Sequence, residues 1–180
     1  MSDETPAPAD TPPPAARISF TEGSLQLPAG YEDRSTNLLV PANTQTQPNL
    51  SVARDWMKPG ENLPAYIERQ LSLLKSQLAS HKLLSRGAAQ LGDPALVEDD
   101  ARRRIGPRID ASYKNGKLLV FQRQAAFEVA PRRVLIFTAS RANGFGEAFE
   151  QLWADWLASY RAPAVVDGSD SAGSGGSAAE

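Results

Sequence analysis

Residues 112–140 read SYKNGKLLVFQRQAAFEVAPRRVLIFTAS, and this stretch decides the fold class. Asn115-Gly116 is typical of a type I′ β-turn, so we expect the chain to reverse there as a hairpin. Apolar residues then alternate from Leu118 to Val129 with the period of two of a β-strand. Ala130-Pro131 interrupts the alternation, and Val134–Ser140 is predicted to return as the next antiparallel strand.

The strand predicted at 118–129 has two unlike faces. Its odd-numbered positions are apolar except for Arg123, whereas the even-numbered positions from 120 to 126 are Val120, Gln122, Gln124 and Ala126. Upstream, the segment 49–54 alternates in the same way, with Leu50 and Val52 on one side and Asn49, Ser51 and Ala53 on the other. The pattern predicts a sheet with one hydrophobic face and one face of small and amide side chains.

Two amphipathic helices are predicted beside these strands. Asn62 is a suitable N-cap and Pro64 suits the first turn. The helix that follows carries one apolar stripe, formed by Leu63, Ile67, Leu71, Leu74 and Leu78. A second stripe spans 145–160 and contains Phe145, Ala148, Phe149, Leu152, Trp153, Trp156, Leu157 and Tyr160. Ala162-Pro163 is expected to end this second helix.

The order of elements indicates the fold class. Strands are also predicted at 18–27 and 35–40, so strand runs are separated by only two helices. This order is typical of an α+β fold, with an antiparallel sheet and two main helices. Residues 1–16 are rich in Pro and Ala and residues 163–180 in Gly, Ser and Ala, so both are predicted to be disordered tails around a domain at 17–162.

Composition excludes several classes of protein. The net charge of −2 gives no overall attraction to nucleic acid, and the absence of cysteine excludes disulfides and thiolate sites. Residues 1–16 are acidic at the start and lack the apolar core of a secretory signal. Since no apolar run reaches the roughly 18 residues that span a bilayer, we expect a soluble, cytoplasmic protein without stable membrane insertion.

No motif predicts catalysis, a metal site or a cofactor. His81 is the only histidine and no G-x-S-x-G elbow accompanies it, and Gly144-Phe145-Gly146 lacks the sequel of a phosphate loop. The acidic run 98–100 lacks the spaced donors of a calcium loop. A basic cluster abuts these carboxylates and has no interleaved aromatic residues, so we expect a solvated hairpin or loop there; its members are Arg102, Arg103, Arg104 and Arg108.

The small and amide face of the predicted sheet is open to two interpretations. Gln122 and Gln124 share it with Asn49, Ser51 and Ala53, and Gln70 lies at the edge of the first helix's apolar stripe. One interpretation is an ordinary solvent-facing sheet. The other is a surface for an apolar helix that still has polar or small residues to satisfy, because uncharged donors and acceptors suit such a ligand.

Seven ordered motifs carry a family resemblance. The chain resembles the DcrB-related family and, within it, the effector-associated (Eag) chaperones of bacterial type VI secretion. The resemblance covers about 18–161 and rests on Phe20-Thr21-Glu22-Gly23, Leu27-Pro28, Asp33-Arg34-Ser35-Thr36-Asn37, Ala53-Arg54, Tyr66-Ile67-Glu68-Arg69-Gln70-Leu71, Gln122-Arg123-Gln124-Ala125 and the tryptophan-containing closing helix.

The resemblance implies both a fold and a function. It implies a Mog1/PsbP-like fold, usually in a homodimer, that shields the hydrophobic N-terminal helices of PAAR- or Rhs-type effectors before export. Gln70 and Gln124 match glutamines of the family's groove. Thr36 and Leu38 stand where bulkier apolar groove residues are common, and Ala53 stands where a serine can occur. The alternative is a non-catalytic accessory module of the same fold that binds a folded protein partner.

Overall fold

The computed structural model describes residues 17–93 and 104–162, and the tails predicted at 1–16 and 163–180 lie outside these ranges. This part of the chain forms eight strands and two helices, in the order β1 (Arg17–Phe20), β2 (Gly23–Gln26), β3 (Thr36–Leu39), β4 (Asn49–Trp56), α1 (Leu63–Gln77), β5 (Ala79–Leu91), β6 (Arg104–Asn115), β7 (Leu118–Ala130), β8 (Arg133–Arg141) and α2 (Glu147–Ala158). The predicted α+β class is confirmed.

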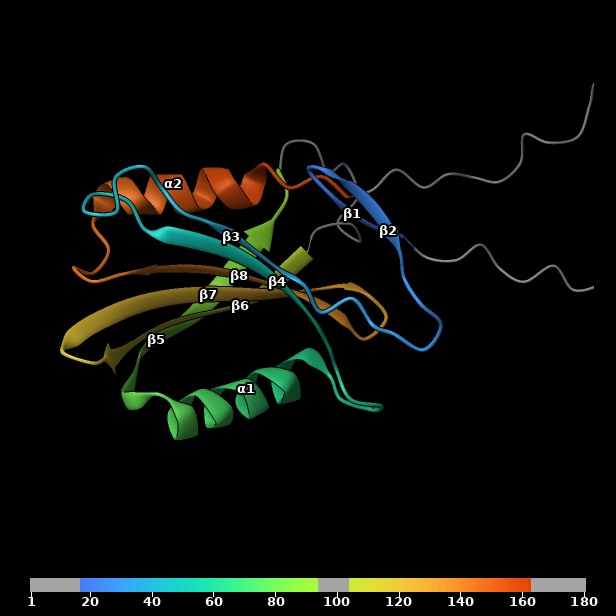
Figure 1. Cartoon of the computed structure of the whole chain (residues 1–180). Helices are drawn as coiled ribbons and strands as arrows, with labels where there is room; N and C mark the ends of the chain where they lie inside the picture. The colour runs from blue at the N-terminus through green and yellow to red at the C-terminus, as the bar shows by residue number, and fades with distance from the viewer. Residues whose placement is uncertain (1–16, 94–103, 163–180) are drawn as a thin grey trace, which may run out of the picture.

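The strands form one main sheet and one small hairpin. The main sheet is six-stranded and antiparallel, in the order β3-β4-β8-β7-β6-β5, while β1 and β2 pair only with each other. The single strand predicted at 18–27 is therefore wrong, because Thr21-Glu22 turn the chain and place Phe20 opposite Gly23. The two helices cover opposite faces of the main sheet (Figure 1).

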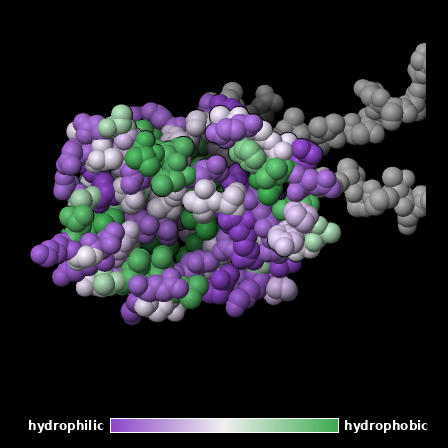
Figure 2. Space-filling model, viewed as in Figure 1, coloured by the Kyte–Doolittle hydropathy of each residue, from purple (hydrophilic) through white to green (hydrophobic). Residues whose placement is uncertain are grey.

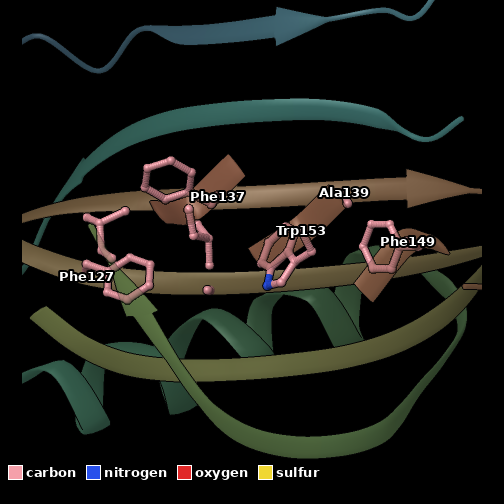
Figure 3. Packing of buried hydrophobic residues seen from close by; sticks show 8 residues of the cluster. Phe127, Phe137, Ala139, Phe149 and Trp153 are labelled. Carbon is pink, nitrogen blue, oxygen red and sulfur yellow. The ribbon is translucent and has the colours of Figure 1, made fainter. Parts of the chain in front are cut away.

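An aromatic core lies between the sheet and α2. Phe127 and Phe137 pack edge to face with ring centroids 5.8 Å apart. Trp153 and Phe149 of α2 belong to the same cluster, and Phe149 lies at its other end beside Ala139 (Figure 3). Arg123, the charged residue on this face, is buried. Its guanidinium lies 2.6 Å from Asp110 and 2.6 Å from Glu150, so two carboxylates compensate the buried charge.

A second core lies between the sheet and α1. The predicted cap is confirmed, because the Asn62 side chain accepts a hydrogen bond from Ala65 N over 3.0 Å. The helix ends at Gln77, with Leu78 as its C-cap. The buried residues of this core come from α1, β6, β7, β8 and the residue directly after β4, and they are Met57, Tyr66, Ile67, Leu71, Ile109, Ala126 and Val134.

Two strand segments differ from the predictions. The sequence does not predict β5, because this mostly exposed strand lacks alternating apolar residues and contains the run Gly87-Ala88-Ala89. Of the solvated hairpin or loop predicted around residues 102–108, the loop is excluded for 104–108, since these residues begin β6 and pair antiparallel with β5. A glycine is required at 106, because a Cβ there would lie 2.0 Å from the Ala126 carbonyl oxygen. Arg102, Arg103 and the acidic run at 98–100 lie outside the described residues.

The hairpin between β6 and β7 forms one residue later than predicted. Asn115 pairs with Leu118, so the two central residues of the turn are Gly116 and Lys117. Gly116 has a φ of +60°, and Lys117 is not among the residues of positive φ. A positive φ at the first central residue alone is the pattern of a type II′ turn, so the predicted type I′ turn is wrong.

Candidate partner-binding groove

Strand register brings the predicted polar positions onto one face of the sheet. Residues opposite each other on antiparallel strands point to the same side. Leu38 pairs with Ser51, Ser51 with Thr138, and Thr138 with Gln124. These residues therefore form one row across β3, β4, β8 and β7.

The flanking rows lie on the same side of the sheet. One runs from Thr36 through Ala53 and Ile136 to Ala126, and the other runs from Asn49 through Ser140 to Gln122. Ala126 packs in the core beneath α1, which identifies this side as the α1 face. All seven strand residues singled out from the sequence thus share the face on which α1, with Gln70, lies.

The α1 helix covers only part of this face. Ala126 and Ile109 are buried beneath it, whereas Gln122 and Gln124 are half-buried and Leu38, at the far edge, is 63% exposed. We call the uncovered strip between α1 and β3 the groove. Hydrophobic side chains gather over β3 and beside α1, and the surface between them is hollowed (Figure 2).

Gln70 and Gln124 line the same hollow. It has a volume of about 70 Å³ and lies between α1 and the sheet. Gln70 enters it from α1 and Gln124 from β7. Most of the other lining residues are apolar, and they are Tyr66, Ile67, Leu74, Pro107, Ile109, Ala126 and Ile136. The amides of Gln70 and Gln124 thus line one largely apolar pocket.

Asp55 fixes the orientation of Gln70. The Gln70 amide Nε2 donates to Asp55 Oδ2 over 3.0 Å, and the Tyr66 hydroxyl donates to the same oxygen over 2.9 Å. Arg34 donates to Asp55 Oδ1 over 3.0 Å. Because a carboxylate offers only acceptors, it holds the nitrogen end of the Gln70 amide and leaves the Gln70 oxygen for the hollow.

Asp55 was missed at the sequence level. The signal was its parity, since Ser51, Ala53 and Asp55 lie at alternate positions of β4 and therefore on one face. Its partners on α1 lie 11 and 15 residues later, and sequence spacing does not show that they reach it.

Tyr66 remains a donor in this cluster. Burial raises the pKa of the Tyr66 hydroxyl well above its ordinary value, and the hydrogen bond to Asp55 raises that pKa further. The phenol therefore keeps its proton at physiological pH and continues to hold Asp55. The start of α1 has a second anchor, because Arg69 donates two hydrogen bonds to Glu61 over 2.7 and 2.8 Å.

Other residues considered from the sequence lie elsewhere. His81 is half-buried near the start of β5, and Gly144-Phe145-Gly146 leads into α2. Within residues 17–93 and 104–162, no group of three or more His, Cys, Asp or Glu side chains could hold a metal ion. Neither helix in this part of the chain is long and apolar enough to cross a membrane.

Comparison with known families agrees with this architecture. The model of the DcrB family matches residues 22–159. The chain belongs to the DcrB family. No curated protein matches the sequence. Among solved structures, this DcrB-family chain is similar to PA94 from Pseudomonas aeruginosa, a protein of unknown function, with a TM-score of 0.64 and 18% identity over 83% of this chain and 98% of that one. At this identity the likeness shows the fold alone.

Proposed function

We propose that this DcrB-family protein is an effector-associated chaperone of a type VI secretion system. In this proposal the groove holds the hydrophobic N-terminal helices of a PAAR- or Rhs-type effector before export. Exposed apolar helices aggregate in water, so a groove that covers them meets a physical need. The protein acts by binding, without a cofactor, in the cytoplasm.

The unused hydrogen-bonding capacity of Gln70 and Gln124 carries the proposal. Within the described residues, the Gln124 side chain has no hydrogen-bond partner. The Gln70 amide nitrogen donates to Asp55 and interacts with the Tyr66 hydroxyl, so the Gln70 oxygen is the part of the amide left for a ligand. Both side chains line a mostly apolar hollow. Such a site suits an apolar helix with a few polar or small residues, because a polar group buried there without a partner would cost free energy.

The test is co-purification of the effector's N-terminal region with variants of the chaperone. Gln70→Arg with Gln124→Arg should abolish retention, because charged side chains would then face an apolar helix. The matched control is Gln26→Arg with Gln151→Arg, since both of these glutamines are exposed and lie outside the groove. If the folded groove variant retains the effector at full yield, the groove is in the wrong place.

A second arm separates this function from the accessory-module alternative. An isolated apolar helix of the effector, supplied in detergent at a low concentration, should bind the chaperone. Binding only to a folded partner would favour the Mog1/PsbP-like accessory module instead.

We also propose that the protein acts as a homodimer. The family resemblance and the low charge of the α1 face support this proposal, because two copies could enclose a helix between them. Sedimentation at micromolar concentration should show a dimer. A strictly monomeric species, with and without effector, would contradict the proposal.

A further inference from the structure

The charges of this chain are unevenly distributed, although its net charge is only −2. No Asp or Glu occurs between Glu68 and Asp93, or between Asp110 and Glu128. The two stretches contain three arginines, and each forms an ion pair with a carboxylate. Arg69 pairs with Glu61, Arg86 with Glu68, and Arg123 with Asp110. The four lysines of the same stretches have no ion pair within the described residues, and they are Lys75, Lys82, Lys114 and Lys117.

The fold brings these four lysines to one end of the molecule. Lys75 lies in the last turn of α1, and β5 begins at Ala79, directly after that helix. Ala79 pairs with Lys114 and Lys82 with Ser112, so the start of β5 lies beside the end of β6. Lys117 forms the turn from β6 to β7. The end of α1, the start of β5 and this hairpin project together at the left of Figure 1.

Exposed leucines accompany the lysines. Leu118 is 61% exposed and Leu119 46% exposed at the start of β7. Leu119 is the cross-strand partner of Lys114 and therefore lies on the same side of the hairpin. We call this set, with the four lysines, the basic tip. The tip is a projecting hairpin, unlike the groove, which is a strip between α1 and β3.

We propose that the basic tip docks the protein on the surface of an anionic phospholipid bilayer. Lysines suit this ligand, because an ammonium on a long flexible stem can reach the phosphates of a fluid array of headgroups. Leucines on a projecting hairpin can enter the boundary between headgroups and acyl chains. The distant carboxylates oppose docking little, because charges are screened over about 8 Å at physiological ionic strength.

This surface contact differs from crossing a membrane and does not depend on the groove. Nucleic acid is a poorer ligand for the basic tip, since the tip offers no arginine for bidentate contacts to bases and its one neighbouring aromatic side chain, Tyr113, is half-buried. An acidic protein could neutralise the lysines, but it would not require leucines beside them on a hairpin. The leucines thus distinguish lipid from an acidic polypeptide.

The test is flotation of the full chain with vesicles of phosphatidylcholine alone or of phosphatidylcholine with phosphatidylglycerol. We expect binding only to the anionic vesicles, and weaker binding as salt is raised. Each lysine near an anionic surface contributes about fivefold to partitioning, so Lys82→Gln, Lys114→Gln and Lys117→Gln together should weaken it on the order of a hundredfold. The control is Lys58→Gln. Lys58 lies just after β4, beside the end of β7 that is far from the basic tip, so this change should leave binding unchanged.

A second pair of measurements distinguishes the two classes of partner. Leu118→Ser with Leu119→Ser should weaken vesicle binding and leave binding to poly-glutamate, an acidic polypeptide probe, unaltered. Anionic vesicles that bind no more protein than neutral ones would overturn the proposal. So would vesicle binding that is equal in the triple-lysine variant and in Lys58→Gln, or binding of poly-glutamate without binding of anionic vesicles. All the changed side chains are exposed, and circular dichroism verifies that each variant is folded.

Discussion

Gln70 on α1 and Asp55 on β4 are joined by a hydrogen bond of 3.0 Å between Nε2 and Oδ2. This bond connects the groove to the core, because Tyr66, which donates to the same carboxylate, is fully buried. It also determines which end of the Gln70 amide faces the groove. The Gln70 nitrogen is held by Asp55, so the group that Gln70 offers to a ligand is an acceptor.

The bond between Tyr66 and Asp55 should contribute to stability. Tyr66→Phe removes a hydrogen bond to a carboxylate, and such bonds contribute about 1.5–3 kcal/mol to the free energy of unfolding. Asp55→Ala should cost more, because it also leaves Gln70 and Arg34 without this acceptor. Urea unfolding of both single variants and of the double variant measures the coupling. Additive losses would show that the two side chains do not interact in solution.

The two ion pairs of Arg123 should differ in strength. Asp110 has 15% of its side chain exposed and Glu150 has 55%, although both lie 2.6 Å from the guanidinium. Glu150→Gln should cost about 0–1 kcal/mol, as exposed pairs do. Asp110→Asn should cost about 3–5 kcal/mol, because it leaves a buried arginine with its exposed partner alone. Equal losses in urea unfolding would contradict this ranking.

Arg123 also shows which parts of the fold the sequence could predict. The strands at 118–130 and 133–141 have strong alternation, so they were predicted in spite of a charge on the apolar side. That charge became explicable only with the structure, because Asp110 and Glu150 lie on other elements.

β5 and the start of β6 show where the alternation failed. Gly87-Ala88-Ala89 in β5 and Gly106-Pro107 in β6 show no alternation of apolar and polar residues. Gly106 is needed because the Ala126 carbonyl oxygen lies close to its Cα, and the local sequence does not show this contact. For the groove, strand parity correctly grouped Asn49 with Ser51 and Ala53. The placement of α1 over the same face depends on long-range packing.

Stability should fall in acid partly through Glu61. Its hydrogen bonds from Arg69 lower the pKa of the Glu61 carboxyl from 4.5 to about 2. Because the folded-state pKa lies below the unfolded one, this contribution is complete above pH 4.5 and is lost as the pH falls towards 2. The thermal midpoint of Glu61→Gln should therefore lie below that of the wild-type protein at neutral pH. The two midpoints should converge through this window, and a constant gap would show that the pair does not form.

The direction of the groove's hydrogen bonding predicts which helices it prefers. The backbone N–H groups of a bound helix already form hydrogen bonds within the helix. A serine or threonine hydroxyl on that helix can still donate to the Gln70 oxygen, and it can form a hydrogen bond with the Gln124 amide. An effector helix with a central serine should therefore bind more tightly than the same helix with alanine there. Gln124→Met keeps the length of the side chain and removes its amide. It should weaken binding of the serine helix about five- to a hundredfold, because a bond worth about 1–3 kcal/mol is lost.

The alanine helix is the control for this comparison, because it has no hydroxyl to leave unpaired. Its affinity should change little or rise in Gln124→Met, since the hollow is otherwise largely apolar. Asp55→Asn should reduce the preference of Gln70 for a donor, because an asparagine can present either end of its amide to Gln70. Fluorescence anisotropy with labelled helices measures all of these affinities. Equal losses for the serine and alanine helices would show that Gln124 acts by packing and not by hydrogen bonding.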